Sequence, residues 1–139
     1  MSMSLFLLLP LDAPLKTEYL NEAAKKLDIP IIFNSDIDLG THSGFLPATV
    51  NSVKAGVEIL KLSFTEVSFI LPPNKDINPK DTLVIQFRMG GSSRETIIAL
   101  YTALLYLSNY NGIVFDSKSN QYFNAEQLQQ NIDAVLQHD

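Results

Sequence analysis

The chain has 139 residues, of which 46% are hydrophobic and 18% charged, a composition typical of one globular domain that needs neither disulfides nor metals to fold. It contains no cysteine, which excludes a disulfide framework, thiolate catalysis and Cys-ligated zinc. The formal net charge of −5 disfavours nucleic acid as a partner, because phosphate binding needs clustered Lys and Arg, and it favours a basic macromolecule. Solubility alone is the stronger reason for a mildly acidic charge.

An apolar run at residues 5–9 opens the chain. We interpret it as a first strand buried on both faces and not as a secretory signal, because no Lys or Arg precedes it and no small-residue cleavage site follows. No other stretch approaches the roughly 20 apolar residues that are needed to span a bilayer. We therefore expect a cytoplasmic protein with no membrane partner.

The first half of the chain combines one helix pattern with several strand patterns. Apolar residues recur at helical spacing over residues 17–27, which predicts an amphipathic surface helix. Residues 29–33 are apolar and β-branched but contain a proline, so we expect an edge strand there. After a polar loop, residues 45–50 and 56–62 predict a hairpin, and residues 68–71 predict a further strand.

The second half contains the strongest patterns. Residues 83–87 alternate between apolar and polar sides and predict a strand. A glycine-rich turn then leads into residues 93–108, which are apolar around most of the helix circumference and predict a central core helix. Ser92 and Glu95 have the spacing of a reciprocal capping box at its start.

The end of the chain completes the fold prediction. Residues 113–116 predict another strand, and Asn124 with Gln127 predicts a second capping box that begins the last helix. Helices interrupt strands without strict alternation, which favours an α+β fold over a parallel α/β fold. We expect residues 1–139 to form a single-domain, two-layer sandwich, a mostly antiparallel sheet with about three helices packed on it.

The turn before the core helix is a candidate anion site. Gly91 and Ser92 offer backbone amides at a helix N-terminus, and Arg88 and Arg94 bracket them. The turn lacks both the Walker lysine and the spaced glycines of a dinucleotide fingerprint. A plain strand-to-helix turn is therefore the competing interpretation.

The polar loop at residues 34–44 carries Asp36, Asp38 and His42. The two aspartates do not have the spacing of an EF-hand, so we predict no metal site. His42 adjoins Ser43, but neighbours in sequence rarely form a catalytic couple, because a base must approach the nucleophile from across the fold. We accordingly predict no catalytic residue, no cofactor and no enzymatic activity.

Four residues near the end of the chain have two interpretations each. Asp116 follows an apolar strand and either caps the next turn through its own backbone or takes part in binding. Tyr106, Tyr110 and Tyr122 are amphipathic enough to anchor a protein interface, although tyrosines at helical or strand spacing are more often half-buried core residues.

Several segments together resemble small bacterial immunity proteins of polymorphic-toxin and type VI secretion systems. The resemblance covers most of residues 43–136, although the chain lacks the Trp found in the best-known immunity superfamily. It implies a cytosolic protein that neutralises a cognate toxin by binding it, without catalysis. The segments are Ser43-Gly44-Phe45-Leu46-Pro47, Gly56-Val57-Glu58, the Ala/Leu-rich helix at 95–107, Asn111-Gly112-Ile113-Val114-Phe115-Asp116 and the capped final helix.

We therefore expect a protein partner, a cognate toxin of basic charge, bound by a monomer or homodimer through acidic loops and exposed aromatic residues. The main alternative is a small enzyme or ligand-binding domain that uses the turn at residues 90–94, and a third is a self-associating structural subunit. The residues predicted to bind the partner are Asp36, Asp38, His42, Glu58, Tyr106, Tyr110, Asp116 and Tyr122.

Overall fold

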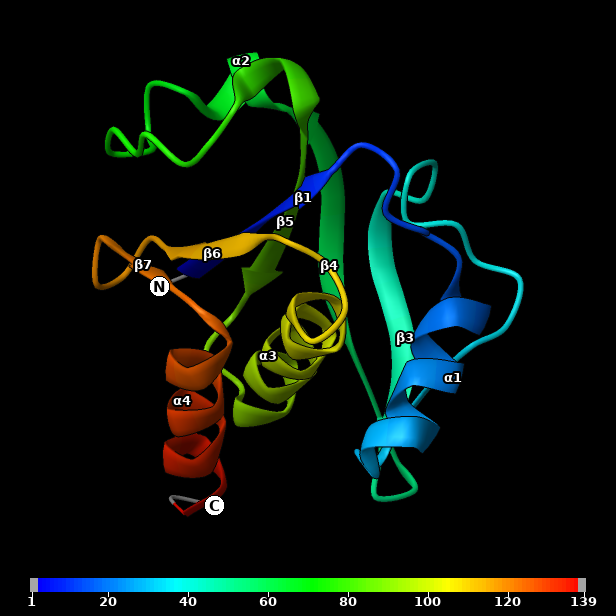
Figure 1. The fold of residues 1–139 in the computed structure, drawn as a ribbon. Helices are drawn as coiled ribbons and strands as arrows, with labels where there is room; N and C mark the ends of the chain where they lie inside the picture. The colour runs from blue at the N-terminus through cyan, green and yellow to red at the C-terminus, as the bar shows by residue number, and fades with distance from the viewer. Residues whose placement is uncertain (1–2, 138–139) are drawn as a thin grey trace.

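The computed structural model describes residues 3–137, which form a seven-stranded antiparallel sheet in the order β2-β3-β4-β5-β1-β6-β7 (Figure 1). This open sheet confirms the predicted α+β class. The strands are β1 (Met3–Pro10), β2 (Ile31–Phe33), β3 (Gly44–Val50), β4 (Val53–Ser63), β5 (Thr82–Met89), β6 (Ile113–Asp116) and β7 (Gln121–Phe123). The helices are α1 (Thr17–Leu27), α2 (Phe64–Val67), α3 (Ser93–Leu107) and α4 (Ala125–Gln137), with a 3-10 turn η1 (Pro79–Asp81).

The first strand lies in the middle of the sheet, between β5 and β6. All five residues of its apolar run are buried, because both faces of the sheet are covered at this position. Leu5, Leu7 and Leu9 belong to the core under the helices, while Phe6 and Leu8 belong to a second cluster on the other face. The prediction of a strand buried on both faces is therefore confirmed.

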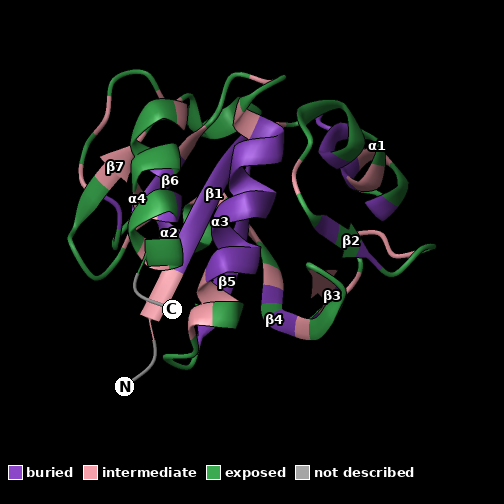
Figure 2. Ribbon diagram, turned by 90° about the horizontal axis from the view of Figure 1, so that it is seen from below, coloured by how far each residue is buried: buried purple, intermediate pink, exposed green. Residues whose placement is uncertain are grey.

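Helix α3 packs across the centre of the sheet, between α1 and α4, and is buried along most of its length (Figure 2). Ten consecutive residues, 97–106, are buried, which explains why the sequence is apolar around most of the helix. The hydroxyl of buried Thr102 donates to the carbonyl of Ile98 at 2.7 Å, and in residues 3–137 no buried side-chain polar atom is left without a partner. The helix thus closes the core without leaving a buried polar group unsatisfied.

Residues 64–81 cover part of the sheet face that is turned away from α1, α3 and α4. We call these residues the cover segment. It contributes Val67 and Leu71 to the cluster with Phe6 and Leu8. The predicted strand at residues 68–71 is wrong. Ser63 and Glu66 form a capping box that starts α2 instead, and the amide of Leu71 then donates to the carbonyl of Val67.

Two connections differ from the sequence prediction in detail. The β3–β4 hairpin turns at Asn51 and Ser52, whose φ angles of 50° and 67° give the two-residue turn that matches strand twist, so β4 starts earlier than expected. Strand β7 was not predicted; it is three residues long and pairs with β6. The capping box of α4 is confirmed by reciprocal hydrogen bonds of 2.9 Å between Asn124 and Gln127.

Candidate functional site

The residues predicted to bind a partner lie in separate parts of the fold. Asp36, Asp38 and His42 lie in the loop between β2 and β3, and Glu58 lies on β4. Tyr106 and Tyr110 lie at the end of α3, whereas Asp116 and Tyr122 lie at the opposite edge of the sheet, on β6 and β7. The structure therefore does not bring these residues together into one surface.

The loop at residues 34–43 is held tightly against α1. The Asp36 amide donates to Glu18 at 2.7 Å, and this bond lowers the pKa of the Glu18 carboxyl. Asp38 accepts from the Gly40 amide at 2.7 Å, and Leu39 between these residues is fully buried. Asp38 thus has a local structural role, while Asp36 is exposed.

Tyr106 is a correction to the sequence prediction, because it is a core residue and is not available to a partner. Its side chain is fully buried, its hydroxyl donates to the carbonyl of Pro14 at 2.7 Å, and burial raises its pKa. Its ring stacks on Tyr19 at 5.6 Å between centroids, and Tyr110 meets Tyr19 edge-on at 5.9 Å. These three rings join α3 to α1.

Asp116 and Tyr122 also make internal contacts. Asp116 accepts from the Lys118 amide at 3.2 Å and from the Ser119 hydroxyl at 2.8 Å, as the turn-capping interpretation predicts. The Tyr122 hydroxyl donates to the carbonyl of Pro72 at 2.6 Å. Tyr122 therefore helps to hold the cover segment against the sheet.

The candidate anion site at residues 90–94 is closed by its own contacts. Ser92 is the N-cap of α3 and accepts from the Arg94 amide, whereas Glu95 accepts from the Gly90 amide at 3.3 Å, so the predicted capping box does not form. A carboxylate thus occupies the turn where an anion would bind. Arg88 projects from the sheet face opposite to α3, because its two strand neighbours are buried under the helices.

Gly91 has a structural reason to be glycine. Its φ of 102° lies in the left-handed region, which side chains other than glycine rarely adopt. Within residues 3–137, no group of three or more His, Asp or Glu side chains is placed to hold a metal ion.

A feature missed by the sequence analysis is an uncovered part of the sheet. We call it the open sheet face. It is formed by β2, β3, β4 and the end of β5, on the side of the sheet that is turned away from the helices and is not covered by the cover segment. Ile32 is 64% exposed and Phe45 57% exposed, and Pro47 and Leu60 are half-buried. Opposite side chains of the same strands, such as Val57, are fully buried.

The ring of Phe45 is held in place although it is exposed. A Cβ atom built on Gly56 would lie 2.0 Å from the ring, so the ring lies directly against the glycine backbone. Gly56 pairs with Pro47, two residues along the hairpin from the pair of Phe45 and Glu58 and on the same face. A glycine beneath an aromatic ring is a known way to fix a ring on a sheet surface.

Side chains protect the outer backbone edge beside this face. Asn21 on α1 accepts from the Phe33 amide at 2.8 Å and donates to the Phe33 carbonyl at 3.0 Å. His42 Nε2 donates to the carbonyl of Phe45 at 2.7 Å, just beyond the end of β2. These side chains occupy the backbone hydrogen-bonding groups that a partner strand would need at the edge, so addition of a strand there is disfavoured. A partner therefore binds more favourably by packing on the open sheet face.

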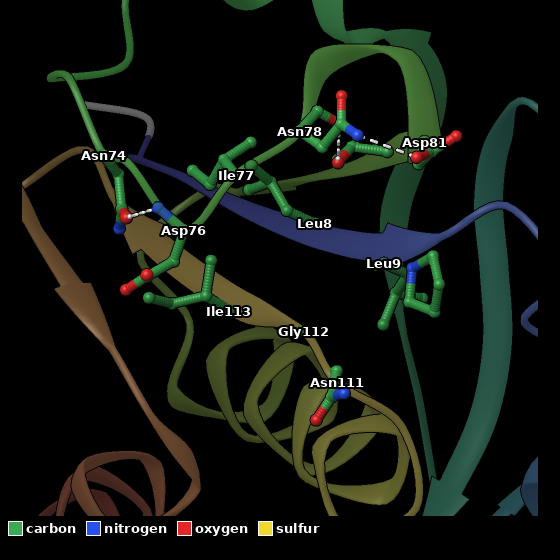
Figure 3. A pocket seen from close by; sticks show the side chains of 12 residues that line it. Leu8, Leu9, Asn74, Asp76, Ile77, Asn78, Asp81, Asn111, Gly112 and Ile113 are labelled. Carbon is green, nitrogen blue, oxygen red and sulfur yellow. Dashed lines mark hydrogen bonds between the residues drawn. The ribbon is translucent and has the colours of Figure 1, made fainter.

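A groove lies where β1 ends, β6 begins and the cover segment returns to the sheet (Figure 3). It has a cavity volume of about 480 Å³. Its floor is apolar, and its rim carries polar side chains. We call it the aspartate groove, with Leu8, Ile77 and Ile113 in the floor and Asn74, Asp76, Asn78, Asp81 and Asn111 in the rim.

Comparisons with protein-family models, with curated proteins and with solved structures each find no match. Within residues 3–137, no helix combines the length and the apolar character needed to cross a membrane. The open sheet face and the aspartate groove are the two candidate binding surfaces described above.

Proposed function

We propose that this protein is a cytoplasmic, non-catalytic immunity-type protein, which binds a cognate protein toxin through its open sheet face. The observation that carries the proposal is the exposed ring of Phe45, which lies against Gly56 on the same sheet face as exposed Ile32. Clustered exposed apolar side chains on a soluble domain mark interaction sites, and aromatic anchors contribute most to binding energy. The immunity assignment itself comes from the sequence resemblance.

Rigidity supports the choice of Phe45 as an anchor. Association costs the conformational freedom of side chains that become ordered at the interface. The Phe45 ring already lies against Gly56 in the free protein, so less freedom is lost when a partner covers it. The hairpin that carries both residues is continuous with the centre of the sheet through β4 and β5.

Charged side chains on the open sheet face support a protein partner further. Glu58 and Arg88 face each other across β4 and β5, yet neither makes a hydrogen bond or ion pair within residues 3–137. Lys54 is exposed on the same side of β4. These groups are available to set the orientation of a partner, since charge complementarity governs specificity and association rate.

The alternative that uses residues 90–94 as an anion site receives no such support. The glycine amide and the N-cap hydroxyl of that turn are both engaged, and the glutamate there would repel an anion.

Affinity capture with matched variants tests the proposal. The tagged protein is used to retain proteins from the lysate of its native cells through a high-salt wash, in parallel with Phe45→Lys and with Leu136→Lys. Leu136 on α4 is 46% exposed and gives a control of the same chemistry away from the face. We expect the wild type and the Leu136→Lys control to retain one protein from the lysate in near-stoichiometric amount. Phe45→Lys should not retain it.

The captured protein must then behave as a toxin. Its expression in a bacterial host should stop growth, and co-expression of the wild-type immunity protein should restore growth. Retention of the same partner by Phe45→Lys contradicts the assignment of the face. If the retained protein is harmless, or if no protein is retained, the immunity proposal is wrong.

A further inference from the structure

We propose that the aspartate groove binds the side chain of an arginine, carried by an extended segment of the partner protein. The identity of that source rests on the proposed function, whereas the affinity of the groove for a guanidinium group does not. The groove is separate from the open sheet face, whose exposed charged residues Lys54, Glu58 and Arg88 give no preference for a basic partner.

The floor of the groove suits the aliphatic part of an arginine side chain. Leu8 is buried on β1, and half-buried Ile113 on β6 and Ile77 in the cover segment pack in the same cluster. Figure 3 shows Leu8 and Ile77 between Asn74 and Asp76 on one side and Asn78 and Asp81 on the other, with Ile113 near Asp76. Long cationic side chains commonly pack their methylene groups on apolar surface while the charged end reaches a polar rim.

The charge of the rim favours a cation. Two aspartates line the cavity, and among the residues that the structure describes no Lys or Arg lines it; Lys75 and Lys80, their neighbours in the chain, are exposed outside the lining. Asp81 accepts from the Asn78 amide group at 2.8 Å, which holds its carboxylate in place. The Asp76 carboxylate makes no hydrogen bond or ion pair with the part of the chain that the structure describes, so it is available to a ligand.

Guanidinium suits this rim better than ammonium does. Its five donors are spread over a plane, so one arginine can bond both a carboxylate and a neighbouring amide oxygen. The rim supplies both kinds of acceptor near one another, since the Asn74 side-chain oxygen accepts from the Asp76 amide at 2.9 Å and so lies close to that aspartate. A bare Ca²⁺ ion is a poorer occupant, because it takes six to eight oxygen ligands and avoids an apolar floor.

The acidic lining continues beyond the groove. A second cavity of about 530 Å³ shares Pro10 and Asn111 with it and is lined by Asp12, with no Lys or Arg. Asp12 therefore lines a depression that adjoins the aspartate groove, and the two together run along the end of β1. This length suits an extended segment of a chain better than a single small molecule.

Amide NMR shifts of the full-length protein test the inference with defined probes. The probe is N-acetyl-Gly-Arg-Gly-amide, and its control is the same peptide with citrulline, which keeps the shape of arginine but has no charge. We expect saturable shifts confined to residues 8–10, 74–82 and 111–113, with half-saturation in the millimolar range. The citrulline peptide should bind at least tenfold more weakly.

Paired variants assign the effect to the groove. Asp76→Asn with Asp81→Asn should weaken binding of the arginine peptide at least tenfold. Glu22→Gln with Glu126→Gln changes the net charge equally on exposed positions of α1 and α4 and should leave binding unchanged. Equal thermal melting of the two double variants shows that a loss of binding is not a loss of folding.

Several results would overturn the inference. These are equal shifts with arginine and citrulline peptides, equal loss with both double variants, or equal binding of a lysine peptide. Tighter binding of free arginine than of the peptide would identify a metabolite as the source instead of a protein segment. If the peptide does not bind while toxin capture succeeds, the groove inference alone fails, and the reverse pattern contradicts the toxin proposal alone.

Discussion

The substitution Gly56→Ala separates binding from stability. The new Cβ would lie 2.0 Å from the Phe45 ring, so the ring must swing away from the sheet. The ring is the outer end of a side chain that is 57% exposed, so a Cβ at Gly56 displaces the ring into solvent, with loss of its contact to the glycine, and the backbone can stay in place. The variant should therefore fold normally and present a displaced anchor.

The expected change in stability follows from two opposing terms. Burial of a whole Phe side chain stabilises a fold by ~1.5–3 kcal/mol, so loss of the buried two-fifths of Phe45 costs about 1 kcal/mol. Replacement of glycine by alanine returns ~0.4–1 kcal/mol, because the unfolded chain has less conformational freedom. The free energy of unfolding should therefore change by less than about 1 kcal/mol.

The expected change in binding is larger. An aromatic anchor contributes ~2 kcal/mol or more to an interface, so the affinity for the partner should fall by about 30-fold. Urea unfolding measures the first quantity and calorimetry with the captured partner measures the second. Without a partner, the upfield ring-current shift of the Gly56 α-protons in the wild type reports that the Phe45 ring lies over them.

Two results would refute this reasoning. A loss of more than about 3 kcal/mol of stability would show that the backbone, and not the ring, has to move. Unchanged affinity for the partner would show that Phe45 is not an anchor. Phe45→Ala is the matched control for Gly56→Ala. It should lose the same binding affinity, and its free energy of unfolding should drop by about 1 kcal/mol.

Three further predictions concern the framework. Gly112→Ala should destabilise the fold by ~1–3 kcal/mol in urea unfolding, because its Cβ would lie 2.7 Å from the backbone oxygen of Leu8, which cannot move freely. Burial raises the pKa of Tyr106, so the native state holds the hydroxyl proton more tightly than the unfolded chain does. The free energy of unfolding should therefore fall as pH rises above ~10. In Tyr106→Phe this fall should be less steep. Asn21→Ala exposes the edge amide and carbonyl of Phe33, so sedimentation should show concentration-dependent association.

Each of these predictions can fail in a specific way. Gly90→Ala is the control for Gly112→Ala, since the atom nearest to a Cβ on Gly90 is the flexible Glu95 carboxylate at 3.4 Å. Equal destabilisation by the two substitutions would refute the steric explanation. Identical alkaline slopes for wild type and Tyr106→Phe would show that Tyr106 titrates normally. A monomeric Asn21→Ala at all concentrations would show that the side chain does not protect the edge.

The fold class was predictable because its main signals are local. The apolar run of β1 and the nearly uniform apolar surface of α3 both require cover on all sides, and a sheet with helices on it provides that cover. Strand β7 was not predictable in this way, because its three residues depend on pairing with β6. The start of α2 was predictable in principle, since Ser63 and Glu66 have capping-box spacing, but the apolar residues that follow them favour a strand when read by pattern alone.

The candidate site was harder to predict than the fold. Tyr106 and Phe45 are both aromatic residues in apolar surroundings, yet one is fully buried and the other mostly exposed. The difference depends on which part of the sheet the helices and the cover segment reach. That coverage is a property of contacts between distant segments, so neither composition nor periodicity shows it.

The most direct test of the account is growth protection by surface variants. Cells that express the captured toxin are given the wild-type protein, Phe45→Lys or Leu136→Lys at matched levels. Wild type and Leu136→Lys should restore growth, and Phe45→Lys should not. Equal protection by all three proteins, or protection by none, would contradict toxin neutralisation through the open sheet face.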